Sequence, residues 1–465
     1  MPHAGNRATA YSGAATQSKA IDLYLAIPLA GVLFALILQP LIISGCAPTD
    51  AECLNASRPE NKIIWPLLAL FAFVVVARNW RRVAIPSHIG WLLGFLAFAG
   101  ASVLWAFRPE LSGIRYLQQV MIVSATVLPA LILTGRGDLL RGLFLCFALA
   151  CVLNVFMVLG PPPVLDANAT PGHTGYFSGK NYLAICAAVA LLLSFHEMTY
   201  SGLRRWMGVA VAGIALVLLV LSNGKTAMGL TLIAPVLATA AFVLRRTLGL
   251  STLAVPLAIL AAYAVLSTVL GFDVYKLSYY AYGDSTFTGR RWIWIFANEQ
   301  IAERPFLGWG YQSFWLVGPD APSVVKAPGW VKTMPNAHNG YLDTILEMGY
   351  LGFLLLLAFV ATTLHAAGRL VDRDPARGWV VLTLAFFIII TNGLESMWMR
   401  AFEFLWLVFL ILAAEVARAR DTGPVAVAPQ GSGPMFPIKT RKRVSALRPA
   451  LSASDRTAHP RSATR

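Results

Sequence analysis

Three short polar motifs in this sequence place side chains suited to anion binding directly before long apolar stretches. They are the ranges Ser178–Asn181, Ser222–Thr226 and Asn336–Asn339. If each stretch is a helix, each motif lies at a helix N-terminus, where unpaired N–H groups carry about half a positive charge. Glycine lets the backbone come close to a ligand, and lysine adds a full charge. One such motif would indicate a lysine that extends toward the membrane surface beside a capping residue, but three together favour an anion site.

Two adjacent arginines, Arg290 and Arg291, strengthen this prediction. A planar guanidinium group can donate two parallel hydrogen bonds, which suits the oxygens of a phosphate. A nucleotide-binding P-loop is not indicated, because Leu219 stands where that motif needs glycine, so we expect no nucleotide and no cofactor. The sequence predicts a site for a phosphate-containing ligand, with the candidate residues Lys180, Asn181, Lys225, Arg290, Arg291 and Asn339.

His338 is the best candidate for a general base in this sequence. The chain has seven histidines, and only His338 and His173 fall on the side of the membrane that carries the three motifs. Histidine exchanges protons near neutral pH, whereas two histidines without nearby cysteines or clustered carboxylates make a poor zinc site, so we expect no metal. His173 lies in a loop rich in proline and glycine and is more typical of a structural residue. Asp343 and Glu347, one turn apart, either belong to the site or pair with an arginine from the loop.

The composition predicts that these residues are held by a membrane protein. Of 465 residues, 57% are hydrophobic and 13% are charged, whereas a soluble protein has about 25% charged residues. The formal net charge is +15, but residues 418–465 contain ten basic and two acidic residues. A basic tail of this kind beside a membrane helix indicates contact with anionic membrane lipids rather than with nucleic acid.

About twelve apolar stretches are long enough to cross a membrane, which takes about 17 to 25 residues. They predict an all-α polytopic membrane protein, because lipid requires every backbone polar group to be satisfied within a helix. The expected organisation is an N-terminal cytoplasmic segment (1–20), nine transmembrane helices (21–270), a long periplasmic loop with short helices (271–338), three further helices (339–416) and a basic, disordered cytoplasmic tail (417–465). The stretches lie near 21–43, 63–76, 89–107, 117–133, 139–159, 182–195, 206–221, 228–243, 252–272, 339–363, 379–391 and 401–414.

Arginine-rich connections fix the expected orientation. Alternate connections carry clusters such as Arg204-Arg205 and Arg245-Arg246, and the positive-inside rule places these in the cytoplasm. The three motifs and the long loop then face the periplasm. Cys46 and Cys53 lie in the first outward connection, where a disulfide and two free thiols are both compatible with their spacing. The remaining cysteines, Cys146, Cys151 and Cys186, fall within spans and are expected to be core residues.

The long loop adds an apolar pattern that predicts a short helix along the membrane surface. Trp292, Ile293, Phe296 and Ile301 alternate there with polar residues. Aromatic residues follow in the same loop, and they indicate either sugar stacking or a belt at the membrane interface. These residues are Trp309, Tyr311, Trp315 and Trp330.

The motif that starts at His338 resembles a known signature. His338-Asn339, nine residues, Gly349, two residues and Gly352 are similar to the signature of O-antigen ligases and related O-linked oligosaccharyltransferases. Looser similarities to the same family cover Gly289-Arg290 with Trp294, Pro305 with Gly308 and Gly310, Phe177–Asn181 and Leu221–Thr226. One departure is Lys225, which stands where many relatives have arginine and which keeps the charge but not the bidentate geometry. On a straight helix, Gly349 and Gly352 would share the face of His338 and allow close helix packing.

The resemblance implies metal-independent, inverting glycan transfer at the periplasmic face of the bacterial inner membrane. The donor would be a glycan on undecaprenyl pyrophosphate and, in a ligase, the acceptor would be the lipid A–core. His338 and Arg290 would be catalytic, while Lys180, Asn181, Lys225, Arg291 and Asn339 would bind substrate. An O-antigen polymerase or a protein O-oligosaccharyltransferase would share the donor and differ in the acceptor. A transporter of the same lipid is the alternative from another class, although transporters usually place charges near the bilayer midplane.

Overall fold

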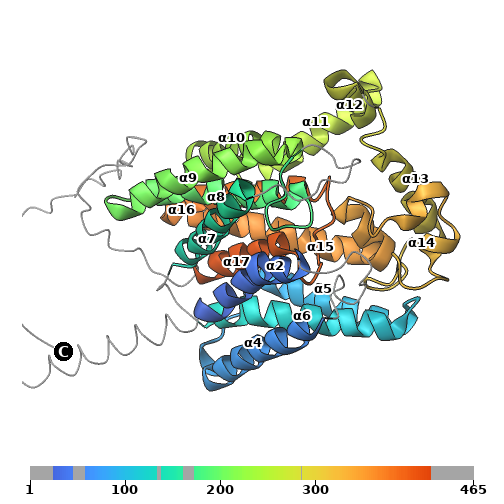
Figure 1. Cartoon of the computed structure of the whole chain (residues 1–465), viewed down its shortest axis with the longest axis horizontal. Coiled ribbons are helices and arrows are strands. Elements are labelled where there is room, and N and C mark those ends of the chain that lie inside the picture. The colour runs from blue at the N-terminus through green and yellow to red at the C-terminus, as the bar shows by residue number, and fades with distance from the viewer. Residues whose placement is uncertain (1–24, 45–57, 133–137, 161–171, 284, 420–465) are drawn as a thin grey trace, which may run out of the picture. The chain divides into compact units, whose positions relative to one another are not determined.

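The computed structural model of the chain describes residues 25–44, 58–132, 138–160, 172–283 and 285–419 (Figure 1). Within these ranges the chain forms helices and no strand, which confirms the predicted all-α class. Cys46, Cys53, the segment 1–20 and the tail beyond residue 419 lie outside the described residues. Cys146, Cys151 and Cys186 are buried, as predicted.

Each of the twelve predicted apolar stretches falls on a helix. Nine helices in the described part of the chain are long and apolar enough to cross a membrane, and a tenth span results if α11 and α12 are counted as one segment bent by 90°. The helix at Pro375–Thr391 has only 17 residues, and that at Phe404–Arg418 has 15. The count of twelve therefore stays a prediction. The helices are Leu25–Ile43 (with the π-helical turn Phe34–Leu38 and α2, Gln39–Ser44), α4 (Pro59–Arg78), α5 (Ser87–Ser102), α6 (Pro109–Leu131), α7 (Leu139–Leu159), α8 (Lys180–Met198), α9 (Leu203–Ser222), α10 (Lys225–Leu248), α11 (Ala254–Leu270), α12 (Val274–Tyr282), α13 (Arg290–Glu303), α15 (Gly340–Arg373), α16 (Pro375–Thr391) and α17 (Phe404–Arg418).

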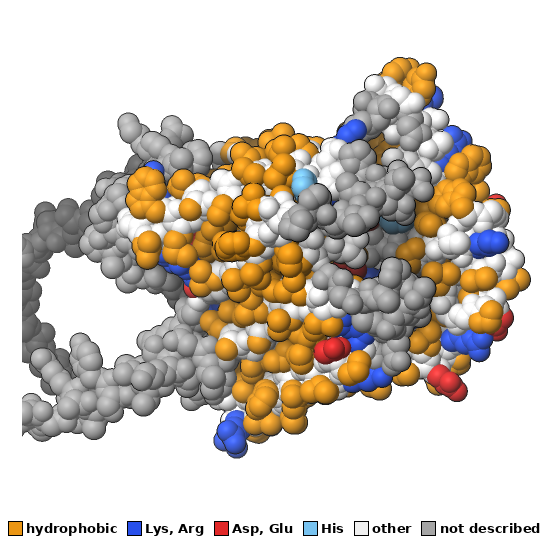
Figure 2. Space-filling model, in the orientation of Figure 1, with side chains coloured by type: hydrophobic (Ala, Val, Ile, Leu, Met, Phe, Trp, Pro, Cys, Tyr) orange, Lys and Arg blue, Asp and Glu red, His pale blue; other side chains and the backbone are white. Residues whose placement is uncertain are grey.

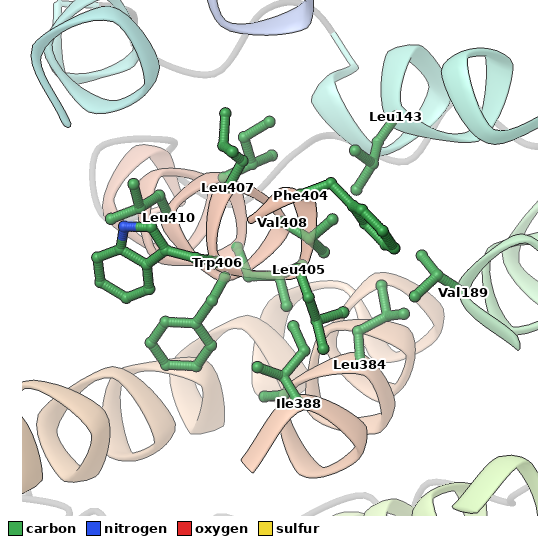
Figure 3. Packing of buried hydrophobic residues seen from close by; sticks show 14 of the residues in the cluster. Leu143, Val189, Leu384, Ile388, Phe404, Leu405, Trp406, Leu407, Val408 and Leu410 are labelled. Atoms are coloured by element: carbon green, nitrogen blue, oxygen red, sulfur yellow. The ribbon is translucent and has the colours of Figure 1, made fainter. Parts of the chain in front are cut away.

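The short helix α17 forms the centre of the bundle. All of its residues are buried, because its sequence is apolar on every face and so has no side to turn toward solvent. Figure 3 shows Phe404, Leu405 and Trp406 of this helix among side chains of its neighbours, such as Leu143 of α7 and Val189 of α8. In a bilayer such a helix is held by close packing against its neighbours rather than by removal from water, because lipid tails are as apolar as these side chains. The centre therefore holds in place the connection that precedes α17.

The outer flanks of the bundle are apolar as well. Along α11, Leu260 is 63% exposed and Val269 is 72% exposed, and hydrophobic side chains cover much of the visible face (Figure 2). A water-soluble protein rarely exposes a continuous apolar surface of this extent, whereas a bilayer solvates it. The chain is thus a polytopic membrane protein by its helices and by its surface.

At one end of the bundle, arginines and carboxylates tie five helices together. The ion pairs include Arg204–Glu197 at 2.6 Å and Arg377–Glu415 at 2.7 Å. All of these groups belong to connections or helix ends that the positive-inside rule places in the cytoplasm, so those connections do gather at a single end. Further pairs at this end are Arg141–Glu197, Arg204–Asp138, Arg377–Asp138 and Arg418–Glu415.

At the other end, the connection 271–338 has its own small core. Besides α12 and α13 it contains α14 (Pro322–Val325) and a 3-10 helix, η4 (Gly329–Thr333). The predicted short helix is confirmed as α13, and its Ile293, Phe296 and Ile301 pack into this core, while Trp292 is 54% exposed. A position of α13 along the membrane surface stays a prediction. Trp309, Tyr311 and Trp315 are buried, so neither sugar stacking nor an interfacial belt describes them; Trp330 is 47% exposed.

Helix α15 is broken at Gly349, where the sequence suggested a straight helix. The backbone of Gly349 has φ 64° and ψ −175°, a conformation that glycine adopts without steric cost. The segment 305–310 fills the break: Trp309 N–H donates to Leu346 O at 3.0 Å, and Tyr350 N–H donates to Pro305 O at 2.8 Å. A Cβ at Gly349 would collide with the Phe306 carbonyl. This glycine of the signature therefore serves the docking of the loop backbone and not helix packing.

Candidate active site

The turn that carries His338 lies at the start of α15 and is held by its neighbours. His338 has φ 49°, a left-handed conformation that is unfavourable for a side chain of this kind. Asn336 Oδ1 accepts a hydrogen bond from His338 N–H at 2.9 Å. Asn339 caps the helix, because its Oδ1 accepts from the N–H groups of Tyr341 at 3.0 Å and Leu342 at 3.2 Å. The motif therefore serves to present His338 at a defined place.

Glu395 brings three of the predicted residues together. It lies in the connection between α16 and α17, and its two carboxylate oxygens have different partners. Oε2 lies 3.3 Å from His338 Nδ1, whereas Oε1 accepts from Arg290 Nη2 at 2.9 Å and from Asn181 Nδ2 at 3.1 Å. The side chain of His338 is 33% exposed and that of Glu395 is 16% exposed. A base, a guanidinium group and an amide therefore meet at one accessible carboxylate.

The connection that carries Glu395 is fixed to the first turn of α15. Gly340 N–H donates to Asn392 O at 2.8 Å and to Glu395 O at 3.1 Å, and Asn339 N–H donates to Ser396 Oγ at 2.9 Å. A Cβ on Gly340 would press against Asn392 Oδ1. The free N–H groups of α15 are thus used to hold the Glu395 connection, so the start of this helix differs from the anion-binding helix end that the sequence suggested.

Helix α13 positions Arg290 from the other side. Gly289, with φ 86°, precedes the helix, and a Cβ there would press on Trp330. One turn after Arg290, Trp294 Nε1 donates to Ala337 O at 2.9 Å, next to His338. Residues four apart share a helix face, so Arg290 reaches Glu395 while Trp294 holds the His338 turn. This accounts for the Gly-Arg-x-x-x-Trp pattern seen in the sequence.

The starts of α8 and α10 border the same place. Lys180 and Lys225 are the first residues of these helices, and both helices follow a glycine, which offers no side-chain oxygen to cap them. A Cβ on Gly224 would collide with Ala184 of α8, so the two helix ends lie against each other. A small pocket opens between them, lined by Asn181, Ala184, Ile185, Gly224, Thr226, Ala227, Thr391 and Glu395. The lysines thus stand beside the pocket that Glu395 lines.

Arg291 does not join Arg290 at Glu395. It is exposed, and its guanidinium lies 4.9 Å from the ring centroid of Tyr275, a cation–π distance. Consecutive helical residues point about 100° apart, which explains why adjacent arginines have different neighbours.

Asp343 and Glu347 form a second, closed cluster around Arg400. Arg400 Nη2 lies 2.8 Å from Glu347 Oε1 and 3.3 Å from Asp343 Oδ2. Trp315 Nε1 donates to Asp343 at 2.8 Å, and Gln312 N–H donates to Glu347 at 3.1 Å. Burial opposes the charge on Arg400, but the carboxylates of Glu347 and Asp343 outweigh it and raise the pKa of the guanidinium above its usual range. The sequence left two alternatives for Asp343 and Glu347, a place in the site or pairing with an arginine of the long loop. The structure shows pairing with an arginine, but this arginine comes from the connection between α16 and α17.

Glu395 and Arg400 were not singled out from the sequence. The sequence prediction rested on cations and histidine on the outward face, and Glu395 is an acidic residue in the last outward connection. The sequence did contain a signal for Glu395. An acidic residue in a short connection on the same side as several cationic motifs is a candidate partner for those cations.

Known proteins resemble this chain over the region that contains most of the site. Residues 210–357, which include Lys225, Arg290 and His338, match the family model described as O-Antigen ligase. The exopolysaccharide production protein ExoQ of Rhizobium meliloti is 26% identical over 326 residues, which are 67% of this chain and 72% of that protein. Glu395 lies beyond the part matched by the family model. The predicted resemblance is therefore confirmed: the chain is a membrane protein similar to the O-antigen ligase family.

Proposed function

We propose that the chain transfers a glycan from an undecaprenyl-pyrophosphate carrier to an acceptor hydroxyl at the periplasmic face of the bacterial inner membrane. The observation that carries the proposal is the meeting of His338, Arg290 and Asn181 at one accessible carboxylate, beside the starts of α8 and α10. The match of residues 210–357 to the family model described as O-Antigen ligase supports it. The arginine-rich ion pairs at the opposite end of the bundle support a periplasmic site, because basic connections stay in the cytoplasm.

In the proposed reaction His338 removes the proton of the acceptor hydroxyl. Its Nδ1 faces Glu395, so Nε2 is the nitrogen that accepts the proton. The hydroxyl oxygen then forms a bond to the anomeric carbon of the donor sugar while the bond from that carbon to the phosphate oxygen breaks. The pyrophosphate leaves with the electron pair, and attack from the opposite face inverts the anomeric centre. General base catalysis of this kind contributes about 10²–10⁴-fold.

Cations at the site stabilise the charge that develops on the pyrophosphate. Arg290 shares the partner Glu395 with His338, and its planar group can bind two phosphate oxygens. Lys180 and Lys225 add charge from the starts of α8 and α10, and Asn181 can donate a hydrogen bond. Asn339 contributes by capping α15 beneath His338, and Arg291 contributes to the long-range field from its place over Tyr275.

The acceptor divides the proposal into two candidates. A ligase transfers the glycan to the lipid A–core, and the family match, described as O-Antigen ligase, favours this acceptor. A polymerase transfers it to another growing glycan, and the similarity to a protein named for exopolysaccharide production favours that alternative. A protein O-oligosaccharyltransferase would use the same donor. A transporter is disfavoured, because the charged residues of the candidate site gather at one end of the bundle, whereas transporters bind substrate near the bilayer midplane.

The test uses purified full-length protein in liposomes with a labelled, undecaprenyl-pyrophosphate-linked glycan and EDTA. Lipid A–core, further lipid-linked glycan and an acceptor protein are supplied in separate reactions, and mass spectrometry of the product identifies the acceptor. We expect transfer without added metal and a loss of about 10²-fold or more in His338→Ala. His365→Ala is the control, since His365 contacts Ser251 far from the site. Undiminished transfer by His338→Ala, or complete dependence on metal, would refute the proposal.

A further inference from the structure

The carboxylate of Glu395 has a geometry that a mere charge partner of Arg290 would not need. Its oxygens are divided: Oε1 binds Arg290 and Asn181, which leaves Oε2 directed at His338 Nδ1. Its backbone carbonyl is held as well, because Gly340 N–H donates to it at 3.1 Å. Side chain and backbone are thus fixed to elements far apart in the chain, namely α8, α13 and the start of α15.

We propose that Glu395 is a positioning residue for His338, which holds the imidazole in the form whose Nε2 accepts the acceptor proton. The inference rests on the proposed function and deepens it. An ionised carboxylate can only accept hydrogen bonds, so a bond to Nδ1 requires the proton to reside there and leaves Nε2 unprotonated. When Nε2 takes the proton, the imidazolium forms beside a negative charge. Glu395 stabilises that cation and does not itself take the proton.

Arg290 links this pair to the donor. The same carboxylate that faces His338 is 2.9 Å from Arg290, so without donor the guanidinium is partly neutralised. A pyrophosphate that binds Arg290 competes with Glu395 for it and leaves more of the carboxylate's charge to His338. Donor binding at Arg290 therefore increases the tendency of His338 to accept a proton, and Glu395 couples the two events.

Several other ionisable groups surround the pair and enter its pH dependence. Tyr182 of α8 donates to Glu403 at 3.0 Å, and both are close enough to Glu395 to interact with its charge. Lys180 and Lys225 lie at the starts of the neighbouring helices. These groups also respond to the charge of Glu395, so the pH profile of a Glu395 variant is read together with a measurement on His338 itself.

The experiment compares kcat, the donor KM and the pH–rate profile of the full-length enzyme with those of Glu395→Asp and Glu395→Gln. We expect kcat to fall by about tenfold or more in Glu395→Gln, with a donor KM that does not rise because Arg290 is no longer shared. Without the carboxylate charge the imidazolium is less favoured, so the acid limb of the profile moves to lower pH. Glu395→Asp should show the same changes to a smaller extent, since the shorter side chain lengthens the 3.3 Å contact.

A readout without turnover completes the test. His338 is labelled with diethyl pyrocarbonate at a series of pH values, and the labelling is measured by mass spectrometry. Its pH dependence should shift in the same direction as the acid limb, and the variants should rank in the same order. Glu303→Gln is the matched control, because Glu303 pairs with Lys326 on the surface of the long loop 271–338. If Glu395→Gln does not fold, the Asp variant decides alone. Profiles and kcat values equal to wild type overturn the inference, provided that His338→Ala is inactive; if His338→Ala is active, the proposed function itself fails.

Discussion

One short connection, Asn392–Glu403, contributes to two ionic clusters, with Arg400 in the first and Glu395 in the second. The two clusters differ in how completely their carboxylates are satisfied. Around Arg400, the side chains of Asp343 and Glu347 are 4% and 7% exposed and also accept hydrogen bonds from Trp315 and Gln312. Around Glu395, the carboxylate is 16% exposed and His338 is 33% exposed. The first cluster is closed and the second is open to a ligand.

The difference indicates separate tasks for the two clusters. A buried ion pair contributes little net stability, but removal of one partner leaves an uncompensated charge. The Arg400 cluster therefore serves to dock the long loop and the last connection onto α15. An accessible cluster in which cations share one carboxylate can exchange that carboxylate for another anion. We therefore expect substitutions in the Glu395 cluster to reduce glycan transfer and substitution of Arg400 to reduce the stability of the fold.

The largest expected effect is on stability, from Arg400→Met. This change leaves Asp343 and Glu347 buried without their cation, so we expect a loss of about 3–5 kcal/mol in the free energy of unfolding. Thermal unfolding in detergent, followed by tryptophan fluorescence, measures it. The triple variant that also carries Asp343→Asn and Glu347→Gln should recover part of the loss. A melting temperature equal to wild type would show that the closed cluster does not hold the loop.

Arg290→Gln should produce the opposite result, with a large effect on transfer and a small one on stability. Loss of the guanidinium should lower kcat by about 10²-fold, or about 3 kcal/mol in the activation free energy. The free energy of unfolding should change by about 1 kcal/mol or less, because Glu395 keeps Asn181 and His338 as partners. Arg304→Gln, at the other end of α13, is the control. Comparable losses in both variants would argue against a role of Arg290 at the pyrophosphate.

The sequence predicted the elements better than the contacts between them. Each predicted apolar stretch falls on a helix, because burial and lipid contact depend on composition over many residues. The partnership of His338 with Glu395 joins residues 57 positions apart, and no spacing rule connects them. The break at Gly349 was also missed, since apolar residues continue through it and the docking of segment 305–310 depends on the tertiary fold. The loop aromatics were assigned to the surface because a 68-residue connection between spans was not expected to have its own core.

A smaller effect is expected from Trp294→Phe, which affects the open cluster indirectly. The change removes the donor to Ala337 O and keeps the aromatic ring, so a buried carbonyl loses its partner at a cost of about 1–3 kcal/mol. The adjacent His338 turn, already in a left-handed conformation, should then be held less well, and transfer should fall by about tenfold. Trp292→Phe on the exposed face of α13 is the matched control. Equal transfer by both variants would mean that this hydrogen bond does not position the base.

The smallest effect separates charge from geometry at the edge of the open cluster. If Lys225 acts through its charge alone, Lys225→Arg should transfer within about threefold of wild type, whereas Lys225→Gln should raise the donor KM by about fivefold. The increase should shrink as salt is added, because screening weakens an exposed charge over about 10 Å at 0.1 M ionic strength. Lys332→Gln, in η4 of the long loop, removes an exposed lysine that the proposal does not use. If Lys225→Gln and Lys332→Gln respond alike, the start of α10 acts only through the general positive field. If transfer by Lys225→Arg instead exceeds that of wild type several-fold, geometry matters as well as charge. The lysine then limits the site because it lacks the bidentate geometry with which arginine binds phosphate.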